Sequence, residues 1–176
     1  MKKIKFLLFS IAVILLSLCS EAQNLSTTIK VQGMDMATAF MKNDFNTFVK
    51  YMHPNIIAFA GGKEKMKTKM DSAYRFMKLF SVTFKRYWIG DPGEIVIYKN
   101  QYQAVLPQST TLKTPLGELI AETYWIVISN DDGKNWWFID TNVYKADKLK
   151  NILPDLSPKL VIPPNKKPRL VPIENN

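Results

Sequence analysis

The stretch ELIAETYWIVISNDDGKNWWFIDT, residues 118–141, decides the fold of this chain because it holds two β-rich segments around a turn signal. Residues 118–129 and 134–141 are rich in β-branched and aromatic residues, and Asn-Asp-Asp-Gly between them is typical of a hairpin turn. Three similar segments, joined by short turns, precede them at residues 82–90, 94–99 and 101–113. Five consecutive strands with tight turns predict a strongly curved antiparallel sheet.

Helical patterns precede the strands. Residues 34–42 place their apolar side chains on one helical stripe, and Asp44 is well placed to cap a second short helix that ends at His53-Pro54. The run IIAFA at residues 56–60 predicts a short buried strand, and residues 63–80 predict a longer helix with a methionine-rich inner stripe. The sequence therefore predicts an α+β domain in which N-terminal helices cover one face of the sheet.

The first 22 residues resemble a secretory signal peptide. A basic MKKIK is followed by a short apolar run, and Ser20 and Ala22 occupy the −3 and −1 positions for cleavage before Gln23. Lipid attachment at Cys19 is the less favoured alternative, because Leu18 stands where lipoprotein processing requires a small residue. We expect an exported protein, periplasmic or secreted, with no transmembrane segment in the mature chain.

The composition disfavours several classes of site. Cys19 is the only cysteine and His53 the only histidine, so we expect no disulfide, no metal site and no bound cofactor in the mature chain. The formal net charge is +9, but the basic residues are spread out and form no nucleic-acid-binding motif. We therefore expect no nucleic-acid partner. A solvated basic surface is the simplest interpretation, and anionic lipid or polysaccharide are the other partners that charge suggests.

The end of the chain differs in composition from the rest. Six prolines fall within residues 151–176, and beyond about Leu153 they exclude a helix or a central strand. We expect a domain over residues 23–150, followed by an extended tail that lies over the body or is disordered.

The order of elements resembles the nuclear-transport-factor-2-like superfamily, which includes ketosteroid isomerase and the SnoaL-type polyketide cyclases. The resemblance covers roughly residues 33–144 and rests on KNDFNTFVKYMHP at residues 42–54 and WWFID at residues 136–140. It implies a cone-like half barrel, with a conical pocket between the helices and the concave side of the sheet.

Most of the catalytic residues that the resemblance implies are missing from this chain. Isomerase-like members use a tyrosine in the first helix, where this chain has Ala37 and Thr38, and an aspartate where it reads AFAG at residues 58–61. Glu122 could correspond to a second family acid, and His53 is the one histidine available for an Asp–His pair. The resemblance thus implies that the standard active site is absent or rebuilt.

Three residues are candidates for catalysis: Asp140, Glu122 and His53. His53 could act as an acid or base, or it could cap a helix end beside Pro54. If the last strands line the cone, Glu122 and Asp140 would be the polar handles of a pocket with a floor of Tyr124, Trp136 and Phe138. Alternatively, Asp140 lies at the strand mouth and bonds to the backbone that follows it.

The last two long strands are apolar on both faces, so something must cover the outer face of the sheet. A partner subunit and the proline-rich tail are the two options, of which a homodimer is slightly preferred. We expect a non-catalytic module that binds a small, partly apolar ligand or a protein partner. The alternatives are an isomerase, cyclase or dehydratase that uses Glu122 or Asp140, and a basic protein attached to an anionic envelope surface through the 63–78 helix and the tail.

Overall fold

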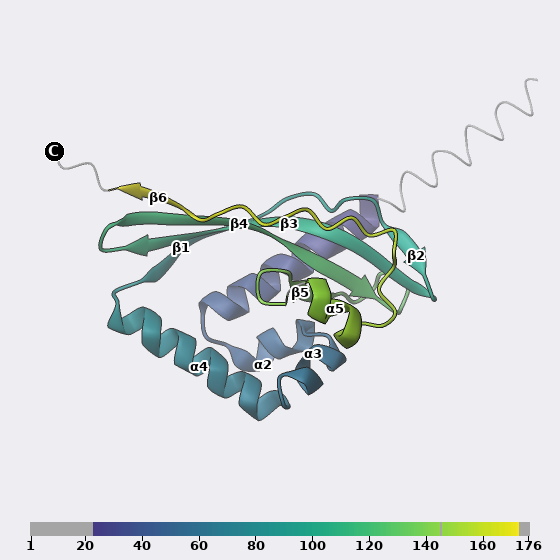
Figure 1. Cartoon of the computed structure of the whole chain (residues 1–176), viewed down its shortest axis with the longest axis horizontal. Coiled ribbons are helices and arrows are strands. Elements are labelled where there is room, and N and C mark those ends of the chain that lie inside the picture. Colours follow the sequence, from purple (N-terminus) through teal and green to yellow (C-terminus); the bar gives the residue numbers. More distant parts are fainter. Residues whose placement is uncertain (1–22, 145, 173–176) are drawn as a thin grey trace, which may run out of the picture.

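The computed structural model describes residues 23–144 and 146–172, and it is an α+β arrangement of helices packed on a six-stranded antiparallel sheet that is not closed (Figure 1). The expected signal peptide and Cys19 lie outside the described residues. Within the described part of the chain, no helix is both long and apolar enough to cross a membrane.

A long hairpin of β3 (Gln101–Thr114) and β4 (Gly117–Ser129) forms the centre of the sheet. β1 (Thr83–Ile89) and β2 (Val96–Tyr98) pair with different parts of the free edge of β3. β5 (Trp137–Asp140) and β6 (Arg169–Pro172) pair in the same way with the end and the start of β4. The five consecutive segments predicted between residues 82 and 141 therefore each contain a strand.

Strand β6 was not predicted, because the prolines around it hide its pairing. It lies at an edge of the sheet, which is where proline is tolerated in a strand. Gly117, its partner at one end, has a φ of +135°, and a Cβ atom there would lie 2.1 Å from the carbonyl oxygen of Val171. Only glycine allows this close approach of the chain end to the hairpin.

The helical part of the chain begins with a helix over residues 23–41, longer at its N-terminal side than the predicted 34–42. The hydroxyl groups of Thr27 and Thr28 donate to the carbonyls four residues earlier, and Ile29 is fully buried. Packing therefore sustains the helix through residues of low helix propensity. The remaining elements are α2 (Phe45–Phe48), η1 (Val49–Tyr51), α3 (Pro54–Phe59), α4 (Lys63–Leu79) and α5 (Ala146–Ile152).

The strand predicted at residues 56–60 is wrong, since these residues form helix α3. His53 has extended backbone angles and caps this helix, because its Nδ1 accepts a hydrogen bond from the amide of Asn55 at 3.1 Å. Pro54 occupies the first turn, where its missing N–H costs nothing and its fixed φ favours a helix. Thus Pro54 ends one helical segment and starts the next, and a short apolar run could not reveal this. The predicted cap at Asp44 is confirmed, with Thr47 N as donor.

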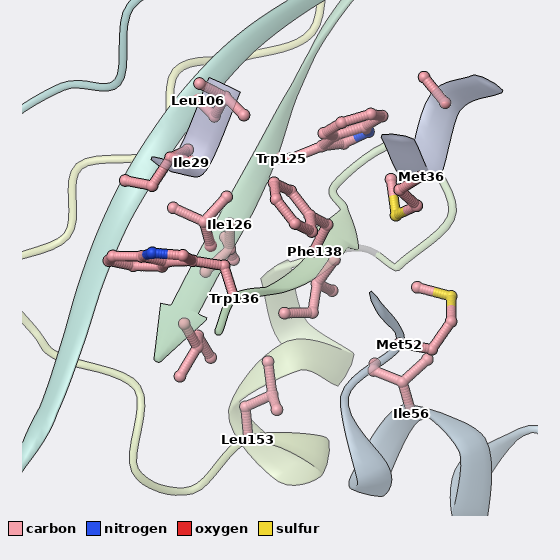
Figure 2. Close-up of a cluster of buried hydrophobic side chains, with 14 of the residues drawn as sticks. Ile29, Met36, Met52, Ile56, Leu106, Trp125, Ile126, Trp136, Phe138 and Leu153 are labelled. Atoms are coloured by element: carbon pink, nitrogen blue, oxygen red, sulfur yellow. The ribbon is translucent and has the colours of Figure 1, made fainter. Parts of the chain in front are cut away.

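The main core lies between the helices and one face of the sheet, which we call the inner face. Trp125 and Phe138 project from this face beside each other, with ring centroids 5.6 Å apart, and Figure 2 shows them with Met36 and Met52 from the helices. The 23–41 helix crosses the same face. Its Gly33 lies so close that a Cβ atom would be 3.1 Å from side-chain atoms of both Ile89 and Phe138.

The opposite, outer face is covered in part by the chain's own C-terminal segment. Gln103 is fully buried there: its amide donates to the carbonyl of Asp155 and accepts from the amide of Ser157, each at 2.8 Å. Further along, the amide of Lys166 donates to the carbonyl of Glu122 at 3.3 Å. Figure 1 shows this segment running along the sheet toward β6. The expected homodimer stays a prediction.

Candidate functional site

A cavity of about 470 Å³ lies between the inner face of the sheet and the helices. The helices line it mainly with methionine, alanine and phenylalanine side chains, and the sheet adds Tyr87, Trp125, Phe138 and Asp140. Its polar groups are few: Asp140, the hydroxyls of Tyr87 and Tyr144, and the amine of Lys69. A mostly apolar wall with a few convergent polar groups is the usual form of a small-molecule site.

Asp140 is the carboxylate of this cavity. It ends β5, and its Oδ1 accepts a hydrogen bond from the amide of Asn142 at 2.7 Å. Burial raises the pKa of the Asp140 carboxyl, while hydrogen bonds from the following backbone and from Trp125 oppose this shift without cancelling it. The carboxyl therefore holds a proton to a higher pH than an ordinary aspartate. The backbone bond is the one predicted for an aspartate at the strand mouth.

Two tyrosines lie near Asp140. Burial raises the pKa of the Tyr87 hydroxyl well above its usual range, and the charge of Asp140 adds to this shift. The same two causes raise the pKa of Tyr144. Both hydroxyls therefore stay protonated and can donate a hydrogen bond. A carboxyl group and two phenols around one apolar space can orient a ligand that carries a carbonyl or hydroxyl group.

The five residues predicted to line one pocket do not share a face of the sheet. Trp125 is the cross-strand partner of Asp140, and Val127 is the partner of Phe138, so the odd-numbered residues of β4 face the cavity. Glu122 and Tyr124 therefore lie on the outer face, and the prediction that they line the same pocket as Asp140 is wrong. The loop between β4 and β5 sets this register, and its length alone does not reveal it.

The side chains of the remaining predicted residues are placed differently from one another. Phe138 lines the cavity, whereas Trp136 is buried elsewhere, with its indole N–H donating to the carbonyl of Gly133 at 2.9 Å. Glu122 forms an ion pair with Lys166, which lowers the pKa of its carboxyl. Glu122 is thus a partly exposed, ion-paired carboxylate in this structure.

His53 does not line the large cavity. Only 8% of its surface is exposed, its Nδ1 is taken by the cap of α3, and its ring packs edge-on against Trp137 with a centroid distance of 4.8 Å. Burial lowers the pKa of the imidazole. This geometry is that of a helix cap, the alternative to acid–base chemistry for His53.

Sequence reasoning missed Tyr87, Trp125, Tyr144 and Lys69 as lining residues. The alternation of Tyr87 and Ile89 in the first strand was the available signal, since residues two apart on a strand share a face. In the part of the chain that the structure describes, no three histidine, cysteine, aspartate or glutamate side chains are grouped in a way that could hold a metal ion.

Comparison with known proteins does not assign the chain to a family. No family model matches it, and no curated protein matches its sequence significantly.

Proposed function

We propose that the protein is an exported binding module with a nuclear-transport-factor-2-like, cone-shaped fold that holds a small, partly apolar molecule. The observation that carries this proposal is the cavity of about 470 Å³ between the inner face and the helices. Its volume lies within the usual range for small-molecule sites, and its wall is mostly apolar.

The lining indicates which ligands suit the cavity. The aromatic rings of Trp125 and Phe138 and several methionines offer apolar contact, so a ring-containing molecule would bury its hydrocarbon surface against them. Asp140, with its raised pKa, and the phenols of Tyr87 and Tyr144 offer hydrogen bonds at one side. A neutral or weakly acidic ligand with one carbonyl or hydroxyl group fits this set better than a cation or a strongly charged anion.

The proposal is tested with the neutral fluorescent probe N-phenyl-1-naphthylamine and a pair of variants on one helix. Met70 of α4 lines the cavity, whereas Met77 on the same helix does not. We expect the probe to bind the wild-type protein, Met70→Trp to fill the space and abolish the binding, and Met77→Trp to leave it unchanged. Absence of probe binding, or equal loss in both variants, would contradict the proposal. Mass spectrometry of molecules that co-purify then identifies the natural ligand.

A second candidate function is catalysis by Asp140. It is favoured by one observation: a carboxyl group with a raised pKa faces an apolar cavity beside the protonated hydroxyl of Tyr87, a setting in which proton transfer is common. Asp140→Asn keeps the side-chain volume and removes the acid. If the co-purified molecule is converted by the wild type about 100-fold faster than by Asp140→Asn while both bind it, the enzyme is favoured. Equal binding without conversion in either protein favours the carrier.

A further inference from the structure

The outer face of the sheet carries a second hollow, which is separate from the inner cavity. It has a volume of about 560 Å³ and lies over β1, β3 and β4, with Lys166 of the C-terminal segment at its border. We call it the outer groove and define it by Arg86, Trp88, Ser109, Glu122, Tyr124 and Lys166. Its wall is mixed in character, with charged, hydroxyl and aromatic groups side by side.

Trp88 forms an aromatic platform in the outer groove. The side chain is 55% exposed, and its ring lies close to Gly90, where a Cβ atom would be 2.7 Å from Trp88 Cη2 and 2.9 Å from Pro107 Cγ. Tyr124 is the cross-strand partner of Pro107 and continues the apolar strip across the sheet. An exposed indole has few rotatable bonds, so it offers a flat apolar surface at a small cost in conformational entropy.

Positive charge surrounds this platform. Five cations lie on or beside this part of the outer face, against two carboxylates, Glu118 and Glu122. Each carboxylate has its own lysine, because Lys85 pairs with Glu118 and Lys166 pairs with Glu122. The other three cations are Arg86, Lys113 and Arg169.

Arg86 of β1 and Arg169 of β6 lie at the two ends of one row of residues across four strands. The two residues between them are Thr111 of β3 and Ile120 of β4. Three strand spacings of about 4.8 Å put the backbones of the two arginines about 14 Å apart. Both arginines are exposed, and no ion pair joins either to a carboxylate within residues 23–144 and 146–172. Arginine is the side chain best suited to bind a carboxylate through two parallel hydrogen bonds.

We propose that the outer groove binds an acidic oligosaccharide, a chain of uronic acid units. One pyranose ring places its apolar C–H face on Trp88, and its carboxylate pairs with Arg86, while a later unit reaches Arg169. Ser109 and Glu122 provide hydrogen-bonding groups for sugar hydroxyls. The outer groove thus combines an exposed aromatic ring, the guanidinium group of Arg86 and hydroxyl-binding groups, and Arg169 lies outside it on the same face of the sheet.

Other anionic partners fit the groove less well. The phosphate groups of a nucleic-acid backbone offer no hydroxyl donors to Glu118 and Glu122, whereas these carboxylates are good acceptors for sugar hydroxyls. A bilayer surface needs protruding apolar groups, whereas Trp88 lines a hollow and lies close to Gly90. Nucleic acid and membrane are therefore outcomes of the test rather than parts of the proposal.

The test is isothermal titration of the purified protein with hexagalacturonate, with maltohexaose as the neutral sugar and polyphosphate as the anion without rings. We expect hexagalacturonate to bind more tightly than either. Trp88→Ala and Arg86→Ala should each weaken it by about 10-fold or more, the size expected for loss of a charge-assisted pair or an aromatic contact. Trp88→Phe should retain most of the affinity. Arg75→Ala is the matched control, since Arg75 is an exposed arginine on α4 and outside the groove.

A second variant tests the platform without removing a groove side chain. Gly90→Ala would force the Trp88 ring to move, so it should weaken hexagalacturonate binding as Trp88→Ala does. Urea denaturation reports whether each variant is folded. The proposal is overturned if hexagalacturonate does not bind or if Arg75→Ala weakens binding as much as Arg86→Ala. It is also overturned if polyphosphate binds as tightly and independently of Trp88, which would indicate a general polyanion or nucleic-acid surface.

Discussion

Two carboxyl groups on opposite faces of the same sheet show how much the face determines chemistry. Asp140 lies on the inner face, where burial is the largest influence and raises its pKa. Glu122 lies on the outer face, where the ammonium group of Lys166 is the largest influence and lowers its pKa. The two residues were predicted to act together, but the strand register separates them by the thickness of the sheet.

The same contrast holds for the aromatic residues of the two faces. Phe138 is fully buried on the inner face, while Trp88 is half-exposed on the outer face. The inner aromatics stabilise the fold and line a cavity, and the outer ones form a surface.

The largest effect is expected for an inner-face aromatic residue. Phe138→Ala should lower the free energy of unfolding by about 3–5 kcal/mol, because it removes a fully buried ring in contact with Trp125 and Tyr51. Tyr124→Ala on the outer face should cost clearly less, since Tyr124 is only partly buried. Urea denaturation of both variants measures the difference. Similar losses in the two would mean that the outer face is packed as tightly as the inner one.

The next largest effect concerns the attachment of the C-terminal segment. Gln103→Ala should cost about 1–3 kcal/mol, because it leaves the carbonyl of Asp155 and the amide of Ser157 without partners at a buried position. Ser109→Ala on the same strand, far from the contact with Asp155 and Ser157, is the control and should cost less. Limited proteolysis should cut residues after Asp155 sooner in Gln103→Ala. Equal protection in both variants would show that these two bonds do not hold the segment.

A smaller effect is expected for the histidine cap. The folded state binds fewer protons than the unfolded chain, because burial lowers the pKa of His53. Its contribution to stability is therefore complete above about pH 6.5 and is lost as the pH falls from there toward the lowered pKa. Protonation also removes the Nδ1 acceptor of the cap.

Unfolding measured at pH 8 and at pH 5 checks this. His53→Asn keeps a capping acceptor and should lose less stability than the wild type between these two values. His53→Ala should cost about 1 kcal/mol at pH 8 through loss of the cap. An unchanged pH dependence in His53→Asn would assign the acid sensitivity to other groups.

The smallest change in stability is expected for Asp140, and its pH dependence is opposite in sign to that of His53. A raised folded pKa means that the folded state binds more protons than the unfolded chain, so the wild type loses stability as the pH rises from about 3.9 through that pKa. Asp140→Asn has no such loss. The stability of this variant relative to the wild type should therefore increase between pH 4 and pH 7. A decrease over the same range would show that the carboxylate is stabilised where it lies.

Local sequence signals were enough for much of the secondary structure. The cap at Asp44 and the 63–80 helix depend on residues within a few positions of one another, and the structure has both, with the helix ending at Leu79. The five β-rich segments were found for the same reason. The signals failed at residues 56–60, where a five-residue apolar run fits a strand or a helix equally well and only the cap by His53 decides.

The lining of the candidate site depends much more on contacts between residues that are far apart in the sequence. Phe138 and Asp140 were identified from their shared strand face, but Tyr87 and Trp125 reach the cavity from other strands, and Tyr144 reaches it from the loop after β5. Whether the odd or the even residues of β4 face inward depends on one step of register between β4 and β5. The pattern of apolar residues does not reveal this register, because both faces of β4 are apolar.

Periodicity and caps within short stretches of sequence predict the α+β class, the positions of five strands and the helix over residues 63–79. Tertiary contacts determine which face each side chain occupies, where the cavity lies, and that a proline-rich end adds strand β6 to the sheet. The physical reason is that strand register and edge pairing depend on contacts between residues far apart in the chain. Those contacts determine where Asp140 and Glu122 lie, and so the environment in which each ionises.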